Sequence, residues 1–327
     1  MIRPRLLLAL MLVAYGTFGG TSPSDASQKQ PPPPKSGWSA SEAPALMNDP
    51  AYAAYDSGDY ALAMKLAMEA AAQGEHPAET LIGDMYEHGL GVKEDNAKAV
   101  EWFSKAAVAG EMYAQFRLGI MLAEGRGIKK DKKKAADFFE AAALQGHALA
   151  AYNLAQIYVE GWVRPQDMQK AAYWLEKAAE KDDAQAAYDL GTLYRNGAGV
   201  PKDDVKAAAL FAKSADGGNM DAEVEYAIML ANGKGVKKDE AAAVKLLQVA
   251  AERGNAVAQN RLARAYSAGL GVAADRIEAA KWHLLARAAG ESDFRLDLLV
   301  MSLKPAERQK AESLAQTWRQ ENEEAAR

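Results

Sequence analysis

The chain has 327 residues, of which 49% are hydrophobic and 25% charged, a composition typical of a folded protein with a core. It holds no cysteine, which excludes disulfides, thiolate catalysis and zinc sites with cysteine ligands. The formal net charge is −5. An acidic protein lacks the basic surface that binding to nucleic acid needs, so nucleic acid is not the expected partner.

Residues 1–26 have the pattern of a secretory signal peptide. Arg3 and Arg5 precede an apolar run from Leu6 to Ala14, and small residues follow. The run is shorter than the about 20 residues that span a bilayer, so we expect a signal that is cleaved between residues 16 and 26. The chain is therefore predicted to be exported, to the periplasm or the medium. An uncleaved membrane anchor is the alternative.

Residues 27–48 form a proline-rich segment that includes Pro31, Pro32, Pro33 and Pro34. Such a segment cannot pack a core, and its prolines favour an extended spacer. A polyproline ligand for an aromatic groove is the alternative interpretation. Helices are expected from about Asp49, and residues 49–74 are predicted to form an N-terminal capping helix pair.

A six-fold repeat organises residues 75–290. Its clearest marker is a loop glycine that returns every 36 residues, at Gly89, Gly125, Gly161, Gly197, Gly233 and Gly269. A fixed period of this length is typical of a stack of helical repeats.

Each repeat carries two helical stripes. In the first helix, apolar residues at i, i+4, i+7 and i+8 make one buried face. A small residue recurs inside that helix and predicts a neighbouring helix close to its backbone, at Gly83, Gly119, Ala155, Gly191, Ala227 and Ala263. An aspartate stands where each second helix starts and is predicted to cap it, at Asp95, Asp131, Asp167, Asp203, Asp239 and Asp275. A glycine closes every unit except the third, where Asp182 stands instead.

Residues 291–327 are predicted to form C-terminal capping helices. Phe294, Leu298 and Met301 still match the apolar columns of the first helices. Pro305 then starts a last helix, with Ala311 and Trp318 on its apolar face.

These columns resemble the Sel1-like repeat family, a longer-looped relative of the tetratricopeptide repeat. The resemblance rests on an Ala-x-x-x-Leu-Gly-x-x-Tyr first helix, a Gly-x-Gly-Val-x-x-Asp loop and an Ala-x-x-Trp-Phe-x-x-Ala-Ala second helix. It implies an all-α fold, an α-solenoid that winds into a right-handed superhelix and serves as an adaptor for other proteins. Exported bacterial members look like envelope signalling, stress or host-interaction factors.

No catalytic, cofactor or metal site is predicted. The histidines are scattered: His76 and His147 are expected in solvent-facing turns, and His283 is expected to pack at an edge. The sequence holds no S-x-x-K, no G-x-S-x-G and no phosphate-binding loop. The chain is therefore not expected to be an enzyme. A hydrolase acting on peptidoglycan or β-lactams is retained as an alternative.

The partner is expected on the face of the first helices that lies away from their apolar stripe. In related superhelices this face lines the concave groove that binds partners. The predicted partner-binding residues are Asp84, His88, Arg117, Ile120, Gln156, Thr192, Ile228, Arg261 and Arg264.

Two further features are candidate contact points. Trp162 and Arg164 lie in the third loop, which lacks its second glycine, and they are possible interface anchors. A basic cluster in the second repeat is a candidate site for an anionic polymer or lipid head group, and comprises Arg126, Lys129, Lys130, Lys132, Lys133 and Lys134.

The sequence thus predicts an exported, non-enzymatic adaptor that binds another protein through the concave face of a helical array. A tether to the cell wall or to anionic lipid is the second alternative. A monomer is favoured.

Overall fold

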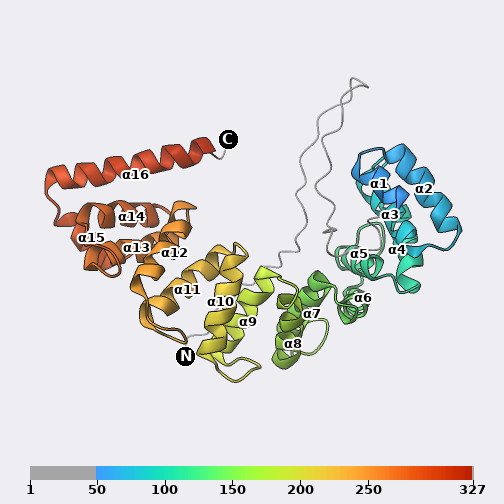
Figure 1. The fold of residues 1–327 in the computed structure, drawn as a ribbon, viewed down its shortest axis with the longest axis horizontal. Helices are drawn as coiled ribbons and strands as arrows, with labels where there is room; N and C mark the ends of the chain where they lie inside the picture. The colour runs from blue at the N-terminus through green and yellow to red at the C-terminus, as the bar shows by residue number, and fades with distance from the viewer. Residues whose placement is uncertain (1–48, 326–327) are drawn as a thin grey trace. The chain divides into compact units, whose positions relative to one another are not determined.

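The computed structural model describes residues 49–325, and the expected signal peptide (1–26) and proline-rich segment (27–48) lie outside them. Over the described residues the chain forms sixteen α-helices and no strand (Figure 1). The predicted all-α solenoid of helix pairs is confirmed. No helix in this range is both long and apolar enough to cross a membrane.

Each repeat contributes one helix pair. The first helices are α3 (His76–His88), α5 (Met112–Glu124), α7 (Ala148–Glu160), α9 (Ala184–Asn196), α11 (Met220–Asn232) and α13 (Ala256–Ala268). The second helices are α4 (Asn96–Val108), α6 (Lys132–Leu144), α8 (Met168–Ala179), α10 (Asp204–Asp216), α12 (Glu240–Glu252) and α14 (Arg276–Ala288). Before them lie α1 (Pro50–Asp56) and α2 (Tyr60–Ala72), and after them α15 (Phe294–Met301) and α16 (Pro305–Ala325).

Side-chain and glycine caps set the ends of these helices. At the start of α10, Oδ1 of Asp203 accepts hydrogen bonds from the backbone N–H groups of Val205 and Lys206, both at 3.0 Å. All six predicted aspartates cap their helices in this way, because a carboxylate satisfies N–H groups that have no partner within the helix. The first helices end on a left-handed glycine. Asp182 adopts the same left-handed backbone, with φ of 62°, in place of a closing glycine.

Close helix packing explains the small residue inside the first helices. A Cβ atom on Gly83 would come within 2.7 Å of the Phe103 ring, and one on Gly119 within 2.7 Å of the Phe139 ring. Both rings are buried and belong to the second helix of the same repeat. The predicted close approach is confirmed. Each second helix then packs against the next first helix, so helix packing is unbroken along the array, and the buried residues gather in successive clusters.

The loop between the paired helices rests on the preceding repeat. Gly127 lies against the backbone carbonyl of Asn96, and Gly235 lies against that of Asp204. These carbonyls belong to the first residues of α4 and α10. Any side chain at the second loop glycine would collide with them. Val163, which stands at this position in the third loop, therefore cannot lie as close to the preceding helix.

The C-terminal helices depart from the repeat pattern. α16 packs along α14, where Trp318 meets Trp282 with ring centroids 6.4 Å apart (Figure 1). α16 therefore takes the place that a further first helix would occupy. As a result Phe294, Leu298 and Met301 are 75%, 48% and 71% exposed, whereas Leu296 is buried. These three residues match the first-helix columns in sequence but are not buried as the residues of those columns are.

Candidate interaction surface

The predicted face of the first helices contains two kinds of position. Some of its polar side chains bond to the next repeat, and we call these bonds the inter-repeat ladder. Nε2 of Gln156 donates to Asp189 at 3.0 Å, and Arg264 Nε donates to Asp293 at 2.5 Å. A third link joins Arg195 to Glu225 at 2.5 Å. These side chains hold adjacent repeats together.

The ladder is most elaborate where α3 meets α1 and α5. The Asp84 carboxylate is buried and accepts a hydrogen bond from the Tyr55 hydroxyl at 2.7 Å. Nδ1 of His88 lies 3.3 Å from one carboxylate oxygen of Asp84, and Nη2 of Arg117 lies 3.7 Å from the same oxygen. Asp84 therefore binds an N-terminal helix, its own helix and the second repeat at once.

A second buried carboxylate, Glu87, lies one turn further along α3. It pairs with Nη2 of Arg117 and, at 2.6 Å, with Nη1 of Arg126. Arg126 also pairs with Glu124. We call this group the α3–α5 charge cluster, and it comprises Tyr55, Asp84, Glu87, His88, Arg117, Glu124 and Arg126.

The contacts of the α3–α5 charge cluster shift the pKa values of His88 and Asp84, among others. The hydrogen bond to Asp84 raises the pKa of His88, although partial burial opposes this. Burial alone would raise the pKa of Asp84, but the hydrogen bond from His88 and the charge of Arg117 outweigh it and hold that pKa low. Because three carboxylates face only two guanidinium groups, protonation of His88 completes the neutralisation.

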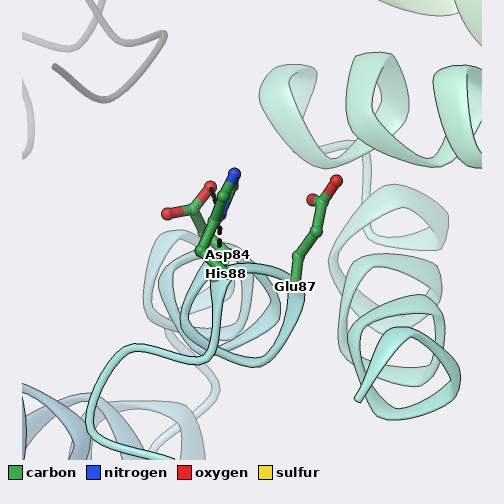
Figure 2. A group of neighbouring side chains, drawn as sticks. All are labelled: Asp84, Glu87 and His88. Atoms are coloured by element: carbon green, nitrogen blue, oxygen red, sulfur yellow. Dashed lines mark hydrogen bonds and ion pairs between the residues drawn. The ribbon is translucent and has the colours of Figure 1, made fainter. Parts of the chain in front are cut away.

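Within residues 49–325, Asp84, Glu87 and His88 also form a group that could hold a metal ion. Their ligand atoms lie within 4.8 Å of one another, and two carboxylates with an imidazole suit a divalent cation. Figure 2 shows Asp84 and His88 side by side, with Glu87 pointing away on its own. Both carboxylates are already paired with Arg117, which a cation would have to displace. The donor set therefore fits an ion-pair cluster better than a metal centre.

The other predicted face residues remain open to solvent. Arg261 is exposed, and so are Asn196 and Asn232, which lie at the ends of their first helices and are not among the predicted residues. Ile120, Thr192 and Ile228 are partly exposed. His88 belongs to both kinds, since its side chain is 40% exposed although it contacts Asp84.

The predicted basic cluster divides in the same way. Lys129, Lys130, Lys132, Lys133 and Lys134 are all exposed. Arg126 pairs with Glu87 and Glu124 and forms part of the α3–α5 charge cluster instead. We therefore leave Arg126 out of the basic surface.

The two possible anchors in the third loop also differ. Trp162 is 88% exposed and is available to a partner. Arg164 is held inside the protein surface: it donates to the Tyr158 hydroxyl at 3.0 Å and pairs with Asp137 and Glu140 at 2.9 Å each. Arg164 thus fixes the loop that presents Trp162.

Two histidine assignments are settled by these contacts. His147 is buried, caps α7 by accepting the Ala150 N–H at 3.2 Å, and stacks on Phe116 with ring centroids 4.2 Å apart. Its placement in a solvent-facing turn was wrong. His283 is buried with Nε2 2.9 Å from Asp297, as expected for a packed histidine.

Sequence reasoning missed Glu87 and Tyr55 as members of the α3–α5 charge cluster. Glu87 lies three residues from Asp84, and Arg117 lies 30 residues after Glu87, about one repeat later. A search for opposite charges separated by nearly one period would have found the pair.

Comparison with known proteins identifies the repeat. The Sel1 repeat model matches residues 76–110, 113–147, 148–183, 184–219, 221–255 and 256–291. The chain belongs to the Sel1 repeat family. Sel1 repeats typically act as scaffolds for protein interaction and are generally not catalytic.

Two solved Sel1-type structures are similar to the chain over most of its length. A Sel1 repeat protein from Oxalobacter formigenes is 33% identical, with a TM-score of 0.61 over 73% of this chain and 98% of that one. A protective antigen of uropathogenic Escherichia coli strains that displays the SLR fold is 28% identical, with a TM-score of 0.54 over 83% of this chain and 67% of that one. A search of curated proteins finds no match.

Proposed function

We propose that this Sel1 repeat protein is an exported, non-enzymatic adaptor that binds another protein along the open part of its first-helix face. One observation carries the proposal: six Sel1 repeats pack in an unbroken array, and the open positions beside and between the ladder bonds differ in chemistry from repeat to repeat. A surface that is uniform in backbone but varied in side chains suits the recognition of one extended partner.

Residues already used by the ladder are poor choices for the binding surface. Arg117 and Arg264 are paired with carboxylates of neighbouring elements, so their replacement would disturb the array itself. Asn196, Asn232 and Arg261 are exposed and lie on three successive first helices. We assign the partner contacts to these positions together with the partly exposed Ile228.

Affinity capture with matched variants tests the proposal. The face variant is Asn196→Arg, Asn232→Arg and Arg261→Glu. Its control carries the same charge changes at exposed second-helix positions, as Gln169→Arg, Gln248→Arg and Lys245→Glu. We expect a protein that wild type and control both capture and the face variant does not. Equal capture by all three forms would contradict the assigned surface.

Export rests on the N-terminal sequence pattern. We expect the mature protein, purified from its native cells, to lack the first 16 to 26 residues. Intact-mass measurement of that protein checks this, and retention of Met1 and the apolar run would contradict cleavage.

A further inference from the structure

A cluster of five lysines lies at the start of α6 with few acidic groups free to neutralise it. Lys129, Lys130, Lys132, Lys133 and Lys134 are all exposed. Two acids close to the lysines in the chain have other partners. Asp131 caps α6 by accepting the Lys134 N–H at 3.0 Å, and Glu124 pairs with Arg126. The result is a local positive surface on a protein of net charge −5.

Acids further along α6 are occupied by the third loop. Asp137 and Glu140 both pair with Arg164 at 2.9 Å. The loop that carries Trp162 is therefore clamped to the helix whose first turn carries three of the lysines. The same contacts offset one of the two negative charges of Asp137 and Glu140.

The ion pairs of Arg164 with Asp137 and Glu140 hold the loop that carries Trp162 against α6. In other repeats the second loop glycine rests on the first residue of the preceding second helix: Gly127 on Asn96, Gly199 on Met168. With the same spacing of 31 residues, the residue that position 163 would lie against is Lys132, the first residue of α6. A Val side chain cannot fit against that backbone as the glycines do, and Trp162, which precedes Val163, is 88% exposed.

We propose that this surface, which we call the Trp–Lys surface, binds the head groups of an anionic lipid bilayer. It comprises Trp162 and the five lysines. An indole that projects into solvent, with no cavity around it, is suited to a soft interface, where tryptophan prefers to sit at head-group level. Lysines on long flexible stems supply the attraction to a layer of negative charge. The Trp–Lys surface is separate from the first-helix face, so a negative result for lipid binding would not contradict the proposed protein partner.

Vesicle flotation of the mature protein tests the proposal. The vesicles are phosphatidylcholine alone or phosphatidylcholine with about 30% phosphatidylglycerol, since only the second carries surface charge. We expect binding to the anionic vesicles alone. Raising the salt from about 50 mM to about 500 mM should abolish it, because the Debye length falls severalfold.

Variants separate the two contributions. Lys132→Glu with Lys133→Glu should weaken binding at least about 25-fold, because each lysine near an anionic membrane contributes roughly fivefold. The matched control makes the same charge change at exposed lysines elsewhere, Lys237→Glu with Lys238→Glu, and should change binding far less. Trp162→Ala should weaken binding several-fold, whereas Phe294→Ala, another exposed aromatic, should not.

A spectroscopic readout locates the contact. Brominated anionic lipids should quench wild-type tryptophan fluorescence more than that of Trp162→Phe, because Trp162 alone would enter the head-group layer. Failure to float with anionic vesicles at low salt would overturn the proposal. So would equal losses in the lysine variant and its control, or binding to a soluble anionic polysaccharide without binding to vesicles.

Discussion

At the scale of residues, the neighbouring repeat decides what a side chain on a first helix does. Arg117 and Arg261 occupy the same position of their repeats. Arg117 meets two buried carboxylates of α3, whereas Arg261 follows a repeat that presents Ile228 in the position of Asp84. The first arginine is consequently part of the fold and the second is exposed.

Removing Arg117 should therefore cost much more stability than removing Arg261. Arg117→Ala leaves Asp84 and Glu87 buried with less compensation, and we expect a loss of about 2–4 kcal/mol in the free energy of unfolding. Arg261→Ala should cost less than about 0.5 kcal/mol. Urea denaturation followed by circular dichroism measures both, and equal losses would argue against the ladder.

The α3–α5 charge cluster should make stability depend on pH through His88. Its pKa is raised in the folded protein by the hydrogen bond to Asp84. A folded pKa above the unfolded value means that the stabilisation is fully present below about pH 6.5 and is lost as the pH rises through the raised pKa. The difference in unfolding temperature between wild type and His88→Gln should shrink across that window. A difference that does not change with pH would contradict the shift.

At the scale of elements, no second helix among residues 49–325 packs against the apolar side of α15 in the C-terminal cap. α16 packs on α14, so the apolar side of α15 that would face a second helix is left in solvent. Phe294 and Leu296 are two residues apart, yet one is 75% and the other 2% exposed.

Truncating the smaller residue, Leu296, should reduce stability more than truncating the larger residue, Phe294. Leu296→Ala should destabilise the protein by about 2–4 kcal/mol, since it opens a cavity in the core. Phe294→Ala should change stability by less than about 0.5 kcal/mol, because the ring buries little. Thermal unfolding of both variants checks this, and a larger cost for Phe294 would mean that α15 is buried in solution.

The loops give a second comparison at this scale. Gly235 has φ of +70° and lies against the Asp204 carbonyl, so Gly235→Val should cost about 2–4 kcal/mol through collision and backbone strain. The third loop already carries a valine at the equivalent position. Val163→Gly should therefore cost about 1 kcal/mol or less. Comparable urea midpoints for the two variants would show that the loops do not seat on the preceding repeat.

Sequence periodicity predicted the structure correctly at positions whose side chain meets the same neighbour in every repeat. The capping aspartates and the small residue at Gly83 and Gly119 repeat because each contacts its own helix pair, and these predictions are confirmed. Periodicity did not predict the surroundings of a side chain where the neighbouring element differs from that of the other repeats. Phe294 kept the column but lost its partner to α16, and Arg117 met carboxylates that other repeats lack.

At the scale of the whole molecule, the first helices form one surface with bonded and open stretches. Among the described residues, ladder bonds join α3 to α5, α7 to α9, α9 to α11, and α13 to Asp293 at the start of α15. Ile120 of α5 and Ile228 of α11 are apolar and partly exposed at such positions. Near the start of α11 the next repeat is bonded through Asn255, which caps α13 and donates to Asp221 at 3.3 Å. The adaptor surface is assigned to exposed positions beside and between the ladder bonds, Asn196, Asn232 and Arg261, together with the partly exposed Ile228.

The account's central claim is that a protein partner lies along the open first-helix face. Site-specific photocrosslinking tests it most directly, with a crosslinking residue in place of Asn232 and, separately, in place of the exposed second-helix residue Gln248. We predict that the protein captured from extract crosslinks at position 232 and not at position 248. Crosslinking at 248 alone, or at neither position although the partner is bound, would contradict the account.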